Sequence, residues 1–194
     1  TSEEELLENM VLRSRLGIPK DSLLVYIQLG AGRINEIDSE IRMTLDSLLL
    51  YPEIYVVIGE SMIGERITFE NERVRILRDY PNSVYFNSFD FAVMAGGYNS
   101  FHEAVRFRLP TICYPNLETG NDDQLARARI AEEAGCMIVV ENRNQQSIKN
   151  AIDVIMNTEN RKKMKQEGSK LHSENGVNNV ADWLIQSIDS TNTL

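Results

Sequence analysis

Short apolar runs alternate with amphipathic stretches along most of this chain. Residues 23–29 form an apolar run that contains Val25 and Ile27, which is typical of a parallel strand covered on both faces. Comparable runs predict further strands at residues 54–58, 74–77, 91–95, 111–114 and 137–140. The sequence therefore predicts a sheet of buried, mostly parallel strands.

The stretches between these runs have helical spacing. From Asn35 to Leu50, apolar side chains recur at positions such as Ile37, Ile41 and Leu45, and Pro52 then stops the helix. Other helices are predicted at residues 6–16, 101–107, 123–134 and 145–156, with two further helical stretches after them. This alternation predicts an α/β fold, a doubly wound, mostly parallel Rossmann-like sheet with helices on both faces.

The length of 194 residues suits a single domain with a sizeable core. We expect residues 1–20 to form an N-terminal helix and linker, and residues 21–190 to form the Rossmann-like core. The chain begins with Thr1 instead of methionine. We therefore expect a piece of a longer protein, although a separate subunit would also fit.

Charge and cysteine content limit the expected partners and the expected cellular compartment. The formal net charge of −9 opposes nonspecific binding to nucleic acid, so nucleic acid is not an expected partner. Cys113 lies in one predicted strand and Cys136 begins another, and we expect free core thiols in a reducing cytoplasm. No apolar run approaches the ~20 residues that span a bilayer. Any membrane contact is therefore expected to be peripheral.

One segment, residues 91–124, combines a strand, a glycine turn and a helix start. The strand ends at Gly96-Gly97, and Asn99 or Ser100 can cap the helix that follows. A helix N-terminus offers unpaired backbone N–H groups and a partial positive charge, and glycines let a ligand approach the backbone. At the carboxyl edge of a parallel sheet, this layout predicts a site for a phosphate or diphosphate group.

Each part of the segment also has a purely structural interpretation. Ser100 and Glu103 have the spacing of a capping box. Residues 121–123 are polar and acidic, which suits the start of another helix. Gly96-Gly97 could simply turn the chain. The order and spacing of all these parts together favour a ligand site.

The whole segment resembles a known family. Gly-Gly-Tyr-Asn-Ser-x-x-Glu at residues 96–103, Leu-Pro-Thr at residues 109–111, a strand ending at Pro115 and then Asp-Gln are similar to the C-terminal, nucleotide-sugar-binding domain of GT-B fold glycosyltransferases. That superfamily includes the peptidoglycan N-acetylglucosaminyltransferase and the UDP-glycosyltransferases. The resemblance implies donor phosphates at Gly96, Gly97, Asn99 and Ser100, ribose at Glu103, and the transferred sugar at Asp123 and Gln124. It also implies that this chain is one half of a GT-B fold.

The same resemblance gives secondary candidates and one departure. Ala95 stands where many members have a histidine that touches a donor phosphate, so that contact is missing. His102 is nearby, inside the first helical turn, and is a secondary candidate. Gly30-Ala31-Gly32 lies where members have a glycine-rich loop that faces the diphosphate. Gly30, Gly32 and Arg33 are therefore secondary candidates as well.

A nicotinamide-cofactor loop is the alternative for residues 30–35, with Glu60 as a candidate ribose-binding acid. The third glycine of the dinucleotide fingerprint is missing, which counts against it. The loop after residues 74–77, with Arg78 and Asp79, lies where family members hold the nucleobase, mostly through backbone groups.

The function implied by the resemblance is transfer of a sugar from a nucleoside diphosphate, expected to be UDP, to an acceptor hydroxyl. Such enzymes need neither a metal ion nor another cofactor, because helix dipoles and side chains stabilise the departing diphosphate. We expect inversion at the anomeric carbon by a base outside this chain, so we assign no catalytic residue within it. The expected partners are the nucleotide sugar and an acceptor-binding half, either a missing N-terminal domain or a separate subunit.

Three other functions stay open. The chain could be half of a nucleotide-sugar 2-epimerase, which needs no acceptor. It could be a non-catalytic module that binds a nucleotide sugar and regulates a partner. The plainest alternative is a Rossmann-like structural domain that binds no nucleotide. The sequence does not name the sugar, the nucleobase or the acceptor.

Overall fold

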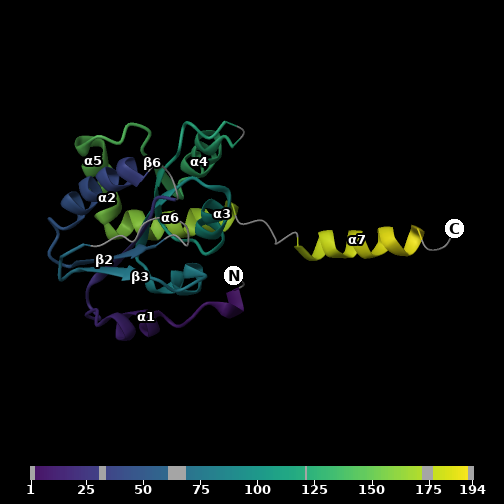
Figure 1. Ribbon diagram of the computed structural model, residues 1–194, viewed down its shortest axis with the longest axis horizontal. Helices are drawn as coiled ribbons and strands as arrows, with labels where there is room; N and C mark the ends of the chain where they lie inside the picture. Colours follow the sequence, from purple (N-terminus) through teal and green to yellow (C-terminus); the bar gives the residue numbers. More distant parts are fainter. Residues whose placement is uncertain (1–2, 31–33, 61–68, 121, 172–176, 192–194) are drawn as a thin grey trace.

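The computed structural model describes residues 3–30, 34–60, 69–120, 122–171 and 177–191 (Figure 1). Its strands are β1 (Leu23–Gln28), β2 (Ile54–Gly59), β3 (Val74–Leu77), β4 (Phe91–Ala95), β5 (Thr111–Tyr114) and β6 (Met137–Val139). They form one sheet in the order β3-β2-β1-β4-β5-β6, and every neighbouring pair is parallel. The prediction of a parallel, Rossmann-like sheet is confirmed, with each strand at its predicted place.

Helices connect these strands and continue beyond them. The α-helices are α1 (Asn9–Leu16), α2 (Ile34–Leu48), α3 (Tyr98–Arg106), α4 (Gln124–Glu133), α5 (Gln145–Met156), α6 (Thr158–Leu171) and α7 (Val177–Thr191). In the described part of the chain, the 3₁₀ helices are η1 (Glu3–Glu5) and η2 (Asn82–Ser88). Helix α3 begins at Tyr98, earlier than the predicted residue 101.

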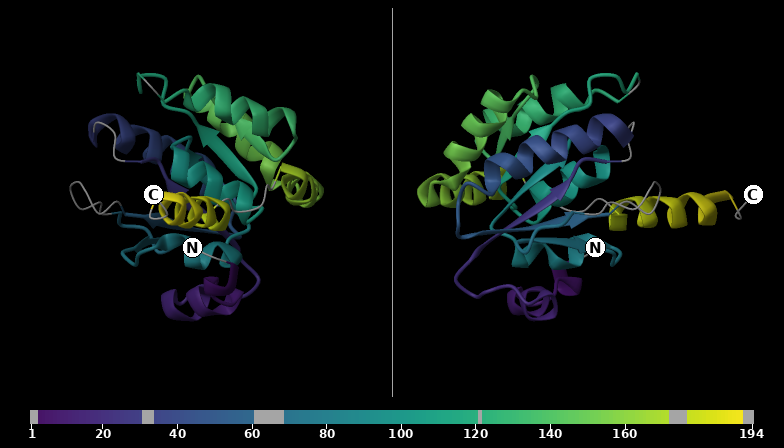
Figure 2. Two further views of the ribbon diagram at one scale, coloured as in Figure 1. Left: turned by 90° about the vertical axis from the view of Figure 1, so that its right-hand side faces the viewer. Right: turned by 60° about the vertical axis from the view of Figure 1, so that its left-hand side comes forward.

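The sheet has a core on each face because successive strand residues point to opposite sides. Val25 and Ile27 of β1 join a cluster with residues of α2 and α5. Leu24 and Tyr26 join a second cluster with residues of α1, α3 and α4. Figure 2 shows α1 and α2 on opposite sides of the sheet. The doubly wound arrangement follows directly from these uninterrupted apolar strands.

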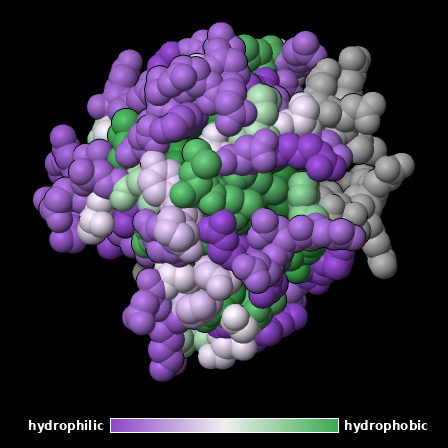
Figure 3. All heavy atoms as spheres, turned by 90° about the vertical axis from the view of Figure 1, so that its left-hand side faces the viewer, coloured by the Kyte–Doolittle hydropathy of each residue, from purple (hydrophilic) through white to green (hydrophobic). Residues whose placement is uncertain are grey.

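The surface is mostly polar, and one projecting helix carries exposed apolar side chains. In the side view of Figure 3, hydrophilic residues cover most of the face and apolar residues gather in its middle. Helix α7 extends away from the sheet in Figure 1 and carries exposed apolar side chains: Val180, Trp183, Leu184 and Ile185. Among the described residues, no helix is long and apolar enough to cross a membrane.

Both cysteines lie in the core as predicted. Cys113 and Cys136 are free and buried. Burial raises the pKa of Cys113 to about 12 and that of Cys136 to about 11. Both thiols are therefore protonated and unreactive near neutral pH.

The strand order reverses between β1 and β4, which lie side by side from Val25 opposite Phe91 to Gln28 opposite Met94. The loops that follow these two strands therefore meet at the carboxyl edge of the sheet. A Cβ atom placed on Gly30 would lie 3.7 Å from the Cβ of Ala95. In open α/β sheets this switch point is where ligands bind.

Candidate functional site

The Gly96–Gly97 pair, called the glycine turn below, joins β4 to α3. Gly97 is the residue before the helix, with φ −58° and ψ 146°, and no side chain caps this helix start. The Phe101 N–H donates to the Gly97 carbonyl at 2.9 Å. The N–H groups of Tyr98, Asn99 and Ser100 come before this first α-helical hydrogen bond, so they have no acceptor within the helix. The glycine turn thus ends in a helix start that can receive an anion.

The expectation that Asn99 or Ser100 caps this helix is wrong, and so is the alternative interpretation of Ser100 and Glu103 as a capping box. Asn99 and Ser100 do not cap α3, because the backbone of Gly97 already takes the conformation that precedes the helix. Ser100 lies inside the first turn. The Glu103 carboxylate instead accepts a hydrogen bond from Ser83 in η2, with 2.8 Å between Ser83 Oγ and Glu103 Oε1. Removing the capping role leaves the polar side chains of Asn99 and Ser100 for other partners.

The two glycines of the turn have different surroundings. A Cβ atom on Gly96 would lie 3.2 Å from the Cβ of Gln124 and 3.4 Å from Cys113 Sγ. Only glycine fits there without displacing a neighbour. A Cβ atom on Gly97 would meet no described atom within 4 Å. Gly96 therefore joins the turn to α4, and Gly97 faces open space where a ligand could approach.

The predicted sugar-binding pair lies at the start of α4. Asp123 caps this helix, because its Oδ1 accepts a hydrogen bond of 2.9 Å from the Ala126 N–H. Gln124 is 8% exposed, and its Oε1 accepts a hydrogen bond of 3.0 Å from the Asn116 N–H. Its Nε2 donates to Asp122 Oδ2 at 3.3 Å. The helix-start interpretation is thus correct for Asp123, and contact of either residue with a sugar stays a prediction.

Arg127 is a further residue in contact with the glycine turn, and sequence reasoning missed it. Its Nη2 donates to the carbonyl oxygen of Gly96 at 2.9 Å and to Asp122 Oδ1 at 2.6 Å. Its guanidinium carbon lies 5.5 Å from the Tyr98 ring centre and 5.8 Å from that of Phe101. Its position in the sequence could have indicated this contact, because Arg127 follows the Asp-Gln pair by one helical turn and so lies on the same face of the helix.

His102 lies on the surface of α3. Its ring centre is 4.3 Å from that of Tyr98 and 5.3 Å from that of Phe101. Partial burial lowers the pKa of His102, and the nearby Arg127 guanidinium lowers it further. The lowered pKa favours a neutral imidazole near neutral pH, packed against the Tyr98 ring in a tilted geometry.

The ends of β2 and β3 form a second polar region at the same edge of the sheet. Glu60 is 9% exposed, and both of its carboxylate oxygens accept hydrogen bonds from Arg78, at 2.6 and 3.2 Å. The Tyr80 hydroxyl donates to the Glu60 carbonyl. Because Arg78 holds both oxygens of Glu60, this carboxylate fits the ribose-binding role of the nicotinamide alternative poorly.

The loop after β3 is held by a further set of side chains. The Asp79 carboxylate accepts hydrogen bonds from the Tyr85 hydroxyl at 2.5 Å and from Arg15. These two contacts lower the pKa of Asp79. Since these side chains bind one another, the loop offers mainly its backbone to a ligand.

The remaining secondary candidates are only partly visible. Gly30 is exposed, and its φ of 82° favours glycine. Gly32 and Arg33 lie outside the described residues. Within the described part of the chain, no group of three or more His, Cys, Asp or Glu residues could hold a metal ion.

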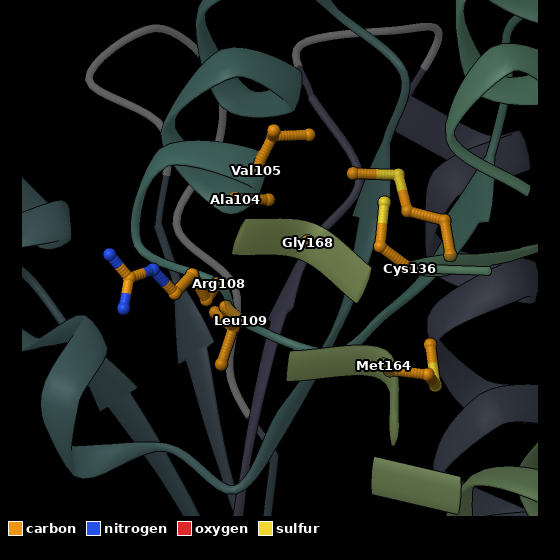
Figure 4. Close-up of a pocket in the computed structure, with 8 residues that line it drawn as sticks. Ala104, Val105, Arg108, Leu109, Cys136, Met164 and Gly168 are labelled. Carbon is orange, nitrogen blue, oxygen red and sulfur yellow. The ribbon is translucent and has the colours of Figure 1, made fainter. Parts of the chain in front are cut away.

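A small apolar pocket lies away from this site (Figure 4). Ala104, Val105, Arg108 and Leu109 line it from the end of α3 and the residues after it, and Gly168 lines it from α6. It lies beyond the other end of α3 from the glycine turn, where α3 packs on α6. The pocket is a packing feature and is separate from the candidate site.

Comparisons with known proteins support the fold. No model of a known protein family matches the chain. The sterol 3-beta-glucosyltransferase of Pichia angusta is 29% identical over 179 residues, and the match covers 88% of this chain but only 14% of that protein. The chain thus spans a small part of this relative.

Solved structures of glycosyltransferases have the same fold. The spinosyn rhamnosyltransferase SpnG complexed with thymidine diphosphate matches with a TM-score of 0.61 and 18% identity, over 78% of this chain and 42% of that one. The spinosyn forosaminyltransferase SpnP gives a TM-score of 0.62 and 14% identity, over 91% and 47%. Acinetobacter baumannii MurG gives a TM-score of 0.67 and 13% identity, over 96% and 57%. This chain therefore has the fold of about half of a GT-B glycosyltransferase.

Proposed function

We propose that this chain is the donor-binding half of a glycosyltransferase that moves a sugar from a nucleoside diphosphate to an acceptor hydroxyl. The observation that carries the proposal is the uncapped start of α3 beside Gly97, at the switch point between β1 and β4. A helix start without a side-chain cap leaves backbone N–H groups for an anion. The glycosyltransferase fold of the relatives supports the same assignment.

The proposed donor extends along the carboxyl edge of the sheet. Its diphosphate lies on the glycine turn, with Asn99 and Ser100 beside it. The ribose hydroxyls donate to the Glu103 carboxylate, which Ser83 orients. The nucleobase lies at the loop after β3, and the transferred sugar lies toward Asp123 and Gln124.

The chemistry proposed for these residues is stabilisation of the leaving group. As the sugar leaves, negative charge grows on the diphosphate, and fixed N–H dipoles stabilise it without reorganisation. No metal ion or other cofactor is required by this arrangement. We assign proton abstraction from the acceptor to a base outside the chain, because the described polar groups at the turn bind or orient the donor.

The missing half supplies the other wall of the cleft. A GT-B enzyme forms its transition state between two such domains, so we propose that this chain works with an acceptor-binding domain or subunit, which could also provide a peripheral membrane contact. We further propose a cytoplasmic setting, where nucleotide sugars and reduced thiols such as Cys113 and Cys136 coexist.

UDP is the proposed carrier, and thymidine diphosphate is the alternative to test, since it is the ligand of SpnG. Calorimetry of the 194-residue chain with UDP, thymidine diphosphate, ADP and GDP, and with the corresponding sugars, tests the proposal. We expect binding of at least one diphosphate and about tenfold weaker binding after Glu103→Ala or Asn99→Ala. The controls are Glu133→Ala and Asn87→Ala, which change exposed residues away from the turn. Binding of none of these ligands would overturn the proposal.

The same ligands separate the alternatives. A non-catalytic module binds the donor but gives no transfer when the missing half is restored. An epimerase half, once restored, interconverts nucleotide sugars without any acceptor. A transferase produces free diphosphate only in proportion to the glycosylated acceptor.

A further inference from the structure

Arg127 of α4 lies directly behind the glycine turn. Its Nη2 holds the carbonyl oxygen of Gly96 at 2.9 Å and also donates to Asp122. The Tyr98 and Phe101 rings lie against the guanidinium, whose side chain is 18% exposed. The cation is thus held at one place beside the start of α3.

The contacts of Arg127 leave part of its hydrogen-bonding capacity unused. A guanidinium carries five N–H donors, and both described hydrogen bonds use Nη2. The Nε atom is buried and has no hydrogen-bond partner among the described residues. An unpaired buried donor costs free energy, so the contacts in this structure do not satisfy the whole guanidinium.

The charge of Arg127 acts on both sides of the glycine turn. In α3 it lowers the pKa of His102, in addition to the larger effect of burial. In β5 it opposes the rise that burial causes in the pKa of Cys113. The positive charge of Arg127 therefore affects groups in both α3 and β5, even though Arg127 is paired with Asp122.

Other described cations near α3 lie elsewhere. Arg106 is in the last turn of this helix, and Arg108 follows its end. Both are at the negative end of the helix dipole, about 12 Å or more from the helix start by the rise per residue. His102 is kept neutral. Arg127 is therefore the described cation best placed to act on an anion at the turn.

We infer that Arg127 is a further donor-binding residue, whose guanidinium binds the diphosphate together with the backbone N–H groups at the start of α3. The inference rests on the proposed function and adds a residue to the same site. A planar guanidinium suits this role because its fixed fork of donors matches phosphate oxygens. The role is binding and charge stabilisation, and Arg127 transfers no proton.

The test compares ligands that differ only in phosphate. The wild-type chain and Arg127→Gln are titrated with UDP, thymidine diphosphate, uridine and thymidine, by calorimetry for the diphosphates and by NMR for the nucleosides. Glutamine keeps a donor for the Gly96 carbonyl but removes the charge. We expect about tenfold weaker binding of the diphosphate and a change of less than about twofold for the nucleoside. Arg127→Lys, which keeps the charge but loses the fork of donors, should weaken diphosphate binding less than Arg127→Gln does.

Arg129→Gln is the matched control. Arg129 also lies in α4, but it pairs with Glu132 and Glu141 on the surface. Its replacement should leave both affinities unchanged. Thermal unfolding establishes that each variant is folded, and Arg127→Met replaces the glutamine variant if that one does not fold.

Two results would overturn the inference while sparing the proposed function. In the first, the wild-type chain binds a diphosphate and Arg127→Gln binds it equally well. In the second, Arg127→Gln weakens nucleoside and diphosphate alike, which would mean that Arg127 only braces the turn. If the wild-type chain binds none of the diphosphates and nucleotide sugars named under the proposed function, that function itself fails.

Discussion

Ser83 donates a hydrogen bond to Glu103, with 2.8 Å between Ser83 Oγ and Glu103 Oε1, and this bond ties η2 to α3. Ser83 is 2% exposed, so its hydroxyl is fixed by the surrounding core. The carboxylate of Glu103 is only half-buried. A buried donor thus orients a carboxylate that is still partly exposed.

Replacement of Ser83 should reduce recognition of ribose. In Ser83→Ala the Glu103 carboxylate loses its orienting donor, and we expect the preference for UDP over 2′-deoxy-UDP to fall about threefold to tenfold. Calorimetry with both ligands measures this ratio. Ser88→Ala is the control, because Ser88 is also buried in η2 but donates to the Asn9 carbonyl, at 3.0 Å. An equal loss of affinity for both ligands in Ser83→Ala would indicate a structural role alone.

The two glycines of the turn should respond in opposite ways to alanine. In Gly96→Ala the new Cβ would lie 3.2 Å from the Cβ of Gln124, and we expect a loss of about 1–3 kcal/mol in the free energy of unfolding. In Gly97→Ala the space is open, so this free energy should change by less than about 1 kcal/mol. Urea denaturation measures both.

The affinity for a diphosphate should also distinguish the two glycines of the turn. The Cβ of Gly97→Ala would occupy the space through which a ligand approaches the helix start, so its affinity for UDP should fall although its stability does not. A stable Gly97→Ala variant with wild-type affinity would place the diphosphate elsewhere.

His102 should report the charge of Arg127. Its pKa is lowered, so the folded chain binds this proton less readily than the unfolded chain does. The stability that His102 contributes is therefore fully present above its ordinary pKa of about 6.5 and declines as the pH falls through that value toward the lower, folded pKa. An NMR titration of the imidazole should show its pKa rising in Arg127→Gln and unchanged in Arg129→Gln. An unchanged value in Arg127→Gln would mean that burial alone sets the pKa.

The sheet and its turns could be predicted because their signals are local. Each strand is a short apolar run, and the parallel arrangement follows from the helices between them. Once β1 and β4 are neighbours, Gly30 and the glycine turn must meet at one edge.

The parts that could not be predicted depend on contacts distant in sequence. Arg127 and Gly96 are 31 positions apart, and Ser83 and Glu103 are 20 apart. Neither contact leaves a pattern within a single helix or strand. The capping-box interpretation was wrong for a related reason, because the spacing of Ser100 and Glu103 does not reveal the backbone conformation of Gly97, the residue that precedes α3.

Substitutions of Asp123 can separate its capping of α4 from its predicted contact with the sugar. Its Oδ1 accepts a hydrogen bond from the Ala126 N–H, so Asp123→Ala should lose about 1 kcal/mol of unfolding free energy while Asp123→Asn keeps the cap. If Asp123 also accepts a hydrogen bond from the transferred sugar, Asp123→Asn should lower the affinity for the nucleotide sugar relative to the bare diphosphate.

Asn144→Ala is the control, since Asn144 caps α5 in the same way, with its Oδ1 2.8 Å from the Ser147 nitrogen. It should lose similar stability and leave this affinity ratio unchanged. An unchanged ratio in Asp123→Asn as well would restrict Asp123 to its cap. This substitution keeps the capping oxygen and replaces the other carboxylate oxygen, the one left to accept from a sugar hydroxyl, by an NH₂ group.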